Sequence, residues 1–180
     1  MSNIRLDKVI VFDLEATCWA TEEEQRLTPS EIIEIGACLL DVRTGEISKK
    51  TRYIIRPKVL EISQYCTDLT GHTVDSVKKG IPFSDACNKF KKEFGTTNKI
   101  SAAYGNDISS LDKECQRYGI VNPLSSSYIN ISHLFALKYK NSKMSLEQAL
   151  KKIDEQFEGT PHHGDDDALN AAKLLRKILS

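Results

Sequence analysis

The sequence predicts an α/β fold in which helices flank a mixed sheet of five strands. Three strand-like segments precede the main amphipathic helices, and Thr44-Gly45 marks a hairpin between the second and third of these strands. Two short apolar runs follow later, each leading into a helix. We therefore expect an antiparallel meander of three strands, which later strands join in parallel. A length of 180 residues suits a single domain covering positions 1–180.

The individual elements follow from apolar periodicity and from turn residues. Strands are expected at 9–14, 32–41, 47–56, 100–103 and 128–131. Helices are expected at 63–69, 83–94, 108–118, 132–139, 146–152 and 166–179. The polar segment 21–29 is predicted to be a loop that covers a site, or else a disordered stretch.

The first strand ends in two acidic residues, Asp13 and Glu15, after the apolar run 9–12. Residues i and i+2 of a strand share a face, so both carboxylates would emerge together at the end of a buried strand. Buried like charges repel unless a cation or a shared proton neutralises them, which favours a metal site. A strand running into a solvated acidic loop explains this pair alone equally well, so further acids are needed.

The last predicted helix opens with three acids, Asp165 to Asp167. Stepping by three or four residues places Asp167 on the apolar stripe with Ala171, whereas Asp166 leads to polar positions. We therefore predict that Asp167 points inward and Asp166 outward. Capping and the helix dipole account for Asp165 and Asp166 but not for an acid on the apolar stripe.

Asp107 opens an earlier helix, after a turn signal at Gly105 and Asn106. Its stripe continues through Leu111 and points toward the sheet, although a plain helix cap remains an alternative. Four inward carboxylates can hold two divalent ions about 3.5 to 4 Å apart, as in-line phosphoryl displacement requires. Their hard oxygen ligands suit Mg²⁺ or Mn²⁺. His162 or His163, just before the last acid, could take a proton from an attacking water near neutral pH.

These motifs together resemble the DEDDh-type 3′-to-5′ exonucleases, and within them the ERI-type and KapD-like branch. Three stretches carry the resemblance: FDLEATCW, YGNDISSLDKECQRYG and PHHGDDDALNAAKLL. EIIEIGACLLD and ISQYCTDLTGHTVDSV support the branch. The resemblance covers nearly the whole chain and implies a ribonuclease H-like fold.

The same resemblance implies a role for each motif residue. Asp13 would bridge two metal ions, Glu15, Asp107 and Asp167 would complete the metal site, and His162 would act as general base. The pocket for the 3′-terminal nucleotide would be lined by Leu14, Ala16, Thr17, Trp19, Leu69, Thr70, Gly71, His72 and Leu111. Family members usually carry a branched aliphatic residue in the place of His72, so this histidine leaves nucleotide preference open. Trp19 and Tyr104 are candidate base-stacking residues, with a place in the core as the alternative.

Composition is compatible with this interpretation. The 25 basic and 25 acidic residues balance, which favours a grip on a few nucleotides over tracking along a duplex. Lys49, Lys50 and Arg52 form a local basic cluster that is either a track for the nucleic-acid backbone or a solvated face. Five scattered cysteines predict reduced thiols in a cytoplasm. We find no signal peptide and no apolar run of transmembrane length, so no membrane association is expected.

We therefore expect a hydrolase that uses Mg²⁺ or Mn²⁺ to release nucleoside 5′-monophosphates from the 3′ ends of RNA or short single-stranded DNA. One alternative is a DNA-directed trimming or proofreading exonuclease. Another is a regulatory or binding protein of a signalling pathway that uses the same fold.

Overall fold

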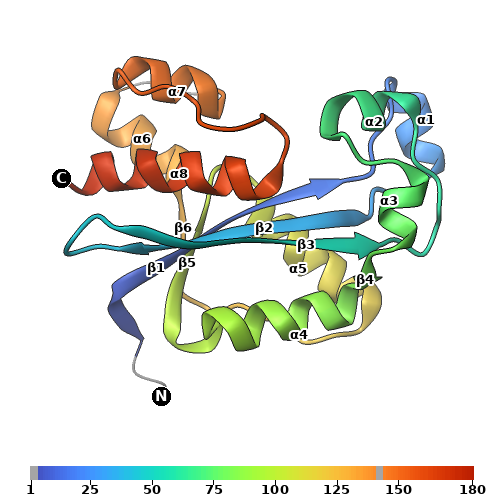
Figure 1. Cartoon of the computed structure of the whole chain (residues 1–180), viewed down its shortest axis with the longest axis horizontal. Helices are drawn as coiled ribbons and strands as arrows, with labels where there is room; N and C mark the ends of the chain where they lie inside the picture. Colours follow the sequence, from blue (N-terminus) through green and yellow to red (C-terminus); the bar gives the residue numbers. More distant parts are fainter. Residues whose placement is uncertain (1–3, 141–143) are drawn as a thin grey trace.

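The computed structural model describes residues 4–140 and 144–180. Its six-stranded sheet has the order β4-β3-β2-β1-β5-β6 (Figure 1). Strands β1 (Arg5–Ala16), β2 (Ile32–Asp41) and β3 (Ile47–Arg56) form the antiparallel meander predicted from sequence. Strands β5 (Lys99–Ala103) and β6 (Tyr128–Asn130) then extend the sheet in parallel from β1.

The predicted strand count was one too low. The sixth strand, β4 (Ile81–Pro82), pairs in parallel with the end of β3. Two residues are too few to show an alternating pattern, and a proline at the sheet edge argues against a strand in sequence-based prediction.

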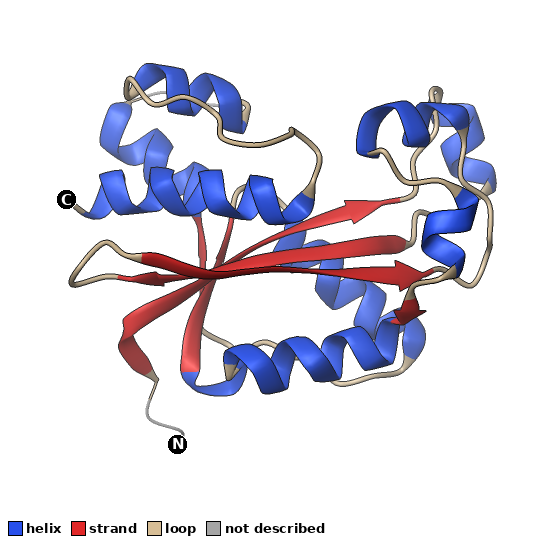
Figure 2. Cartoon of the chain, in the orientation of Figure 1, coloured by secondary structure: helices blue, strands red, loops and turns tan. Residues whose placement is uncertain are grey.

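Helices cover both faces of this sheet. The main helices are α4 (Phe83–Phe94), α5 (Asp107–Tyr118), α6 (Ile131–Tyr139), α7 (Leu146–Lys152) and α8 (Gly164–Leu179). Helices α6, α7 and α8 lie on one face, and α4 and α5 lie on the other (Figures 1 and 2). Alternate residues of β1 serve the two cores: Val9 and Val11 pack toward α8, whereas Ile10 and Phe12 pack toward α4 and α5. The central strand is therefore buried on both sides, as its continuous apolar run predicted.

Three short helices gather at the end of the sheet where β1 finishes (Figure 1). They are α1 (Glu22–Leu27), α2 (Gln64–Thr70) and α3 (Val74–Lys78), and a 3₁₀ turn spans Thr96–Asn98 elsewhere in the chain. The expectation of a loop or disorder over 21–29 was wrong, and α3 was not predicted. Helices α1 and α3 each begin with a capping box, formed by Thr21 with Glu24 and by Thr73 with Ser76. Helices this short show too little apolar periodicity to be predicted.

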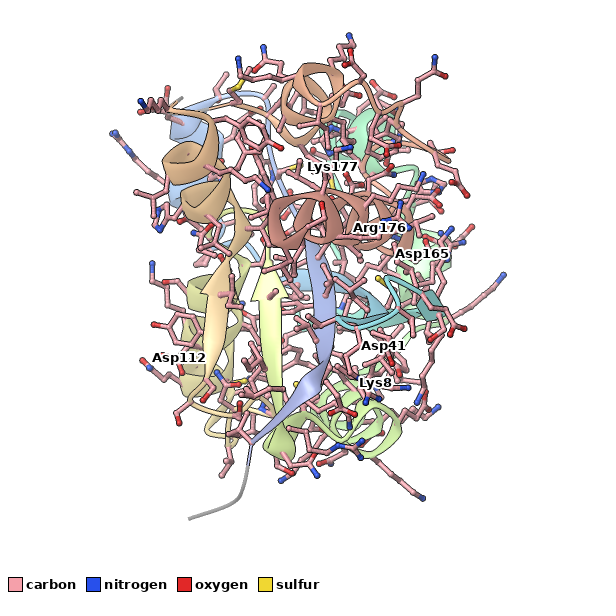
Figure 3. All side chains as sticks on the ribbon, turned by 90° about the vertical axis from the view of Figure 1, so that its left-hand side faces the viewer. Lys8, Asp41, Asp112, Asp165, Arg176 and Lys177 are labelled. Atoms are coloured by element: carbon pink, nitrogen blue, oxygen red, sulfur yellow. The ribbon has the colours of Figure 1, made fainter. Side chains whose placement is uncertain are left out.

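Helix α8 rests directly on the backbone of β2. A Cβ atom at Gly36 would lie 1.9 Å from the carbonyl carbon of Gly164, so no side chain fits between the strand and the first turn of the helix. At the other end of α8, Arg176 Nη1 donates to the Gly45 carbonyl in the β2–β3 turn at 3.4 Å. Figure 3 shows Arg176 and Asp165 on the side of α8 that faces this hairpin. The position of α8 is thus fixed from both ends.

All five cysteines are free thiols, and four of them are buried, as expected for core thiols. Among the described residues, no helix is long and apolar enough to cross a membrane.

Candidate metal centre

The acidic pair lies at the end of β1, which is an inner strand of the sheet. Asp13 pairs with Gly36 and Glu15 with Glu34 in the antiparallel ladder with β2, and the register shifts immediately after Glu15. The two carboxylates therefore leave β1 on one face, where the strand stops pairing regularly.

The other two predicted acids reach this point from helices. Asp167 lies in the first turn of α8, and ligand oxygens of Asp13, Glu15 and Asp167 all lie within 4.8 Å of one another. Asp107 is the first residue of α5, and its charge acts on both Asp13 and Glu15. Its plain capping role is not observed, because the residue before it, Asn106, is the cap. The structure thus brings together all four carboxylates that the sequence singled out.

Burial and mutual repulsion dominate the electrostatics of this cluster. Burial, followed by the charges of Asp107, Glu15 and Asp167, raises the pKa of Asp13 well above its ordinary value. Burial and the charges of neighbouring acids raise the pKa of Glu15 to about 9. Burial likewise raises the pKa of Asp107 to about 7, and the charge of Asp167 adds to this shift. Burial also raises the pKa of Asp167 to about 7, and the charge of Asp166 adds to that shift. Such a cluster is costly when ionised unless a cation neutralises it.

Two oxygen atoms in the cluster lack any partner within residues 4–140 and 144–180. Asp107 Oδ2 and Asp167 Oδ2 are buried and accept no hydrogen bond. Buried polar atoms are nearly always satisfied, so two orphaned oxygens in one cluster require an explanation. Four carboxylates with free lone pairs suit hard divalent ions such as Mg²⁺ or Mn²⁺. The donor set therefore fits a metal centre.

The two histidines before α8 occupy different environments. His162 is exposed and adopts a left-handed backbone conformation with φ of 62°, and its backbone N–H lowers the pKa of Asp167 by hydrogen bonding. His163 caps α8 without a side-chain hydrogen bond, and its Nδ1 lies 4.0 Å from Asp166 Oδ2. Its Nε2 would be 3.5 Å from a Cβ placed on Gly71, so His163 packs between α8 and the segment after α2.

The prediction that Asp166 points outward was wrong. Asp166 is only 8% exposed, and its carboxylate contacts the Lys50 ammonium and accepts the Thr160 N–H at 2.9 Å. Burial raises its pKa, but Lys50 and Thr160 outweigh burial, so the pKa lies below its ordinary value. Arg52 lies 4.0 Å from Asp165, so two members of the predicted basic cluster meet acids of α8. The prediction from the helical stripe failed for Asp166 because β3 packs beside α8 and supplies a cation to the polar face of the helix.

Residues expected to line the nucleotide pocket fall into two groups. Leu14, Ala16 and Leu69 are partly exposed and Gly71 is exposed, whereas Thr17, Trp19, Thr70, His72 and Leu111 are buried. Leu111 is fully buried in the core beneath the sheet, so its side chain does not reach the surface of the site. Trp19 is 9% exposed, and Tyr104 donates its hydroxyl hydrogen bond to the Met144 carbonyl at 2.8 Å.

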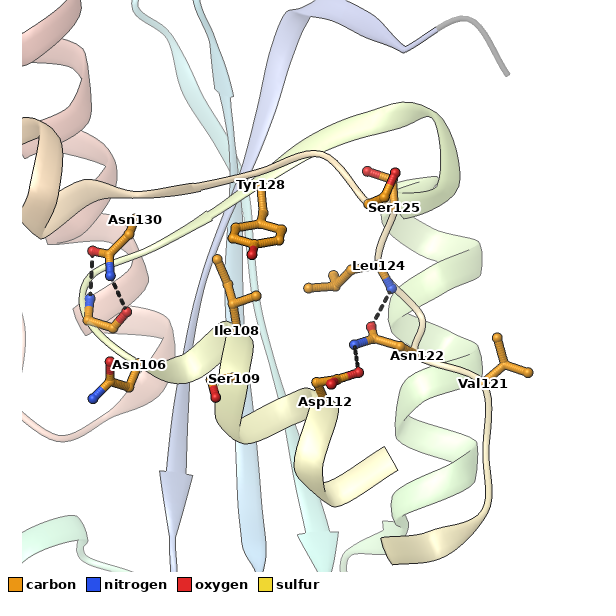
Figure 4. Close-up of a pocket in the computed structure, with 12 residues that line it drawn as sticks. Asn106, Ile108, Ser109, Asp112, Val121, Asn122, Leu124, Ser125, Tyr128 and Asn130 are labelled. Atoms are coloured by element: carbon orange, nitrogen blue, oxygen red, sulfur yellow. Dashed lines mark hydrogen bonds between the residues drawn. The ribbon is translucent and has the colours of Figure 1, made fainter. Parts of the chain in front are cut away.

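A hollow of about 650 Å³ lies beside α5. It extends from Gly105 and Asn106, next to Asp107, along β6 to the loop that contains Asn122 (Figure 4). The ring of Tyr128 faces into it and is 60% exposed. Sequence reasoning missed this hollow because it is formed by segments that lie apart in the chain.

Sequence reasoning also missed Glu34, which is fully buried beside the cluster and adds to the repulsion on Asp13, Glu15 and Asp167. The signal was present as a single acid within the apolar run IIEIGACLL at 32–40. A buried charge of this kind requires hydrogen-bonding partners, which the sequence cannot name.

Several known proteins are similar to this chain in sequence. A sequence model of the Exonuclease family (RNase_T) matches residues 10–175. The 3′-5′ exonuclease Snipper of Drosophila melanogaster is 31% identical over 95% of this chain and 69% of its own length. Human 3′-5′ exoribonuclease 1 is 31% identical over 96% of this chain. The chain spans only 52% of that enzyme and 28% of mouse ERI1 exoribonuclease 2.

Solved structures show the same architecture. The nuclease domain of 3′hExo, a DEDDh family member bound to rAMP, superposes with a TM-score of 0.85 at 30% identity, covering 96% of this chain and 92% of that one. A 3′-exonuclease in a complex with a histone mRNA stem-loop superposes with a TM-score of 0.85 at 27% identity, covering 96% of this chain and 81% of that one. The expected ribonuclease H-like fold is thereby confirmed.

Proposed function

Because the chain belongs to the Exonuclease family, we propose that it is a metal-dependent 3′-to-5′ exonuclease acting on the 3′ ends of RNA or short single-stranded DNA. The observation that carries this proposal is the carboxylate cluster. Ligand oxygens of Asp13, Glu15 and Asp167 lie within 4.8 Å of one another, the charge of Asp107 acts on the first two, and Asp107 and Asp167 each have an oxygen without a hydrogen bond. The family match over 10–175 also supports treating residues 1–180 as one exonuclease domain.

In this proposal each acid has a defined role. Asp13, Glu15, Asp107 and Asp167 would hold two ions, Mg²⁺ or Mn²⁺. Bound ions of this kind neutralise charge on the attacking and leaving oxygens of an in-line phosphoryl displacement. The carboxylates themselves orient the site, because they are fixed to β1, α5 and α8, which pack on one sheet.

His162 is the proposed general base, which takes the proton from the attacking water. Its exposed position in the loop just before α8 leaves the imidazole free to face solvent and substrate. His163 is packed toward Asp166 and Gly71, which makes it the poorer candidate. The products would be a nucleoside 5′-monophosphate and a shortened strand with a new 3′ hydroxyl.

The terminal nucleotide would contact the end of β1 and the segment after α2. Leu14 and Ala16 on β1, and Leu69 and Gly71 on the α2 side, have the exposure that this contact needs. The rAMP bound to the related nuclease domain supports a nucleoside monophosphate as product. Buried Thr17, Thr70 and His72 would shape the pocket from below.

A digestion time course tests the proposal. Matched RNA and DNA oligonucleotides, single- and double-stranded, are incubated with Mg²⁺, Mn²⁺ or a chelator, and each strand is also supplied with its 3′ or its 5′ end blocked. We expect metal-dependent release of mononucleotides that a bulky 3′ block stops and a 5′ block does not. Cleavage of a circular strand at the same rate would identify an endonuclease, and binding of 3′ ends without turnover would identify a regulatory protein.

A further inference from the structure

Glu34 is a buried acid for which the proposed chemistry has no role. It lies on β2 directly opposite Glu15 and is 0% exposed. One carboxylate oxygen, Oε1, accepts the N–H of Gly164 at 2.8 Å. The other, Oε2, lies 2.7 Å from Nε2 of His72. Both oxygens thus have a protein partner, unlike the orphaned oxygens of Asp107 and Asp167.

The Gly164 contact fixes the start of helix α8. Gly164 is the first residue of α8, and Asp167 follows in the same turn. The residue at the cap position, His163, offers no side-chain hydrogen bond to the helix. Glu34, on strand β2, therefore supplies the acceptor that a capping side chain would usually provide.

The His72 contact fixes the segment proposed to meet the terminal nucleotide. His72 follows α2 and the left-handed Gly71 and is 7% exposed. Its Nδ1 lies 3.5 Å from Ser76 Oγ in α3, so both ring nitrogens face polar atoms. The ring is therefore held in place between β2 and α3 and does not project into solvent.

We propose that Glu34 is a positioning residue of the metal centre, which holds the first turn of α8, and with it Asp167, in register with the His72 end of the nucleotide-binding segment. This inference rests on the proposed function for the roles of Asp167 and of the segment 69–72. The carboxylate suits the task because it is rigidly placed on a central strand and accepts hydrogen bonds from both sides. A neutral apolar residue would leave the Gly164 N–H without an acceptor.

Three variants at two positions separate positioning from charge. Glu34→Ala removes both contacts, and His72→Leu removes one contact only. Glu34→Gln removes the charge, keeps an acceptor for Gly164 and turns an N–H donor toward His72 Nε2, which accepts it in the other imidazole tautomer. Glu31→Ala is the matched control, since Glu31 is 6% exposed and its carboxylate accepts hydrogen bonds from Lys58, Val59 and Tyr118. Those partners lie outside the metal centre, so Glu31→Ala shows what the loss of a buried, hydrogen-bonded acid costs when no residue of the metal centre is touched.

The expected results concern kcat at saturating Mn²⁺ with a single-stranded oligonucleotide. Glu34→Ala should lose about 10²-fold in kcat, the scale expected when a catalytic group moves by about 1 Å. Glu34→Gln should stay close to wild type, and His72→Leu should fall between them. Because both side chains act through one contact, adding His72→Leu to Glu34→Ala should cause little further loss.

A second measurement does not depend on turnover. Calorimetric titration with Mn²⁺ should show weaker binding by His72→Leu than by Glu31→Ala, although neither variant removes an acid next to the metal site. Thermal melting reports how far each variant is destabilised, and if Glu34→Ala does not fold, the Glu34→Gln and His72→Leu results still decide the question.

The proposal is overturned if Glu34→Gln is as impaired as Glu34→Ala at saturating Mn²⁺, which would make Glu34 a charge donor to the metal site. It is also overturned if His72→Leu binds Mn²⁺ and turns over like Glu31→Ala. Failure of the wild-type protein to digest any oligonucleotide would instead defeat the proposed function, while the Mn²⁺ titration would still test Glu34.

Discussion

Asp166 and Asp167 are neighbours in the first turn of α8, yet they belong to opposite kinds of environment. Asp166 meets Lys50 and the Thr160 N–H, and its pKa lies below the ordinary value. Asp167 meets Asp13 and Glu15, keeps an orphaned oxygen, and has a pKa raised to about 7. The first is an acid with its cation supplied by the fold, and the second is an acid whose cation must come from outside.

The difference shows how one helical turn can serve both stability and chemistry. Paired acids such as Asp166 secure α8 against β3, whereas unpaired acids repel one another when ionised, and a bound ion or a retained proton relieves that repulsion. Substitutions on the two sides of the turn should therefore have opposite effects on stability and on activity.

The largest effect is expected at the unpaired acids. Asp13→Ala, Glu15→Ala or Asp167→Ala should reduce the rate of mononucleotide release by about 10³-fold or more. The reason is that loss of an ion site removes several kcal/mol of transition-state stabilisation. In a chelator the same variants should melt no lower than wild type, since repulsion is relieved. Melting and turnover are measured on the same preparations, and an Asp13→Ala protein with wild-type turnover would disprove the metal assignment.

The next effect separates the two histidines. His162→Ala should lose about 10² to 10⁴-fold in rate, as expected for a general base, whereas His163→Ala should lose little. The His162 variant should recover part of its rate as pH rises, because hydroxide becomes available without the base. Rate profiles against pH for both variants decide which histidine is the general base. A larger defect in His163→Ala would reverse the assignment.

The paired side of the turn should show the opposite behaviour to the unpaired side. Asp166→Ala should lower the free energy of unfolding by about 1 to 2 kcal/mol, because the Thr160 N–H and Lys50 lose a partly buried partner. Its activity should remain near wild type. Denaturant unfolding and turnover assays provide the check, with Lys173→Ala as a control for the exposed ion pair to Glu158. An inactive but fully stable Asp166→Ala protein would contradict this division of roles.

The unpaired acids also predict a pH dependence of the metal-free protein. Asp107 and Asp167, with pKa values of about 7, and Glu15, with a pKa of about 9, retain protons in the folded state that the unfolded chain has released. Stability in chelator should therefore fall as pH rises from about 6 to about 9, and Mn²⁺ should restore it most at the alkaline end. Asp167→Asn should flatten the profile, and a melting temperature that rises over this interval would refute the assigned shifts.

The sequence was sufficient for features that repeat along a single element. The apolar run before Asp13 predicted the central strand, and the stripe through Ala171 predicted the inward side of α8. It was insufficient where the partner comes from elsewhere in the chain. Asp166 was misplaced because Lys50 lies 116 positions away, and β4 was missed because two residues form a strand only beside β3. The contacts of Glu34 could not be derived for the same reason.

The close contact between Gly36 and Gly164 has a consequence for the order of assembly. Asp13 belongs to the first strand and Asp167 to the last helix, so the cluster exists only after α8 has settled on β2. Chains fold from the amino terminus as they leave the ribosome. A nascent chain can therefore complete its sheet before the carboxylate cluster exists, and the cluster forms only when α8 docks. The absence of a side chain at Gly36 leaves room for that docking.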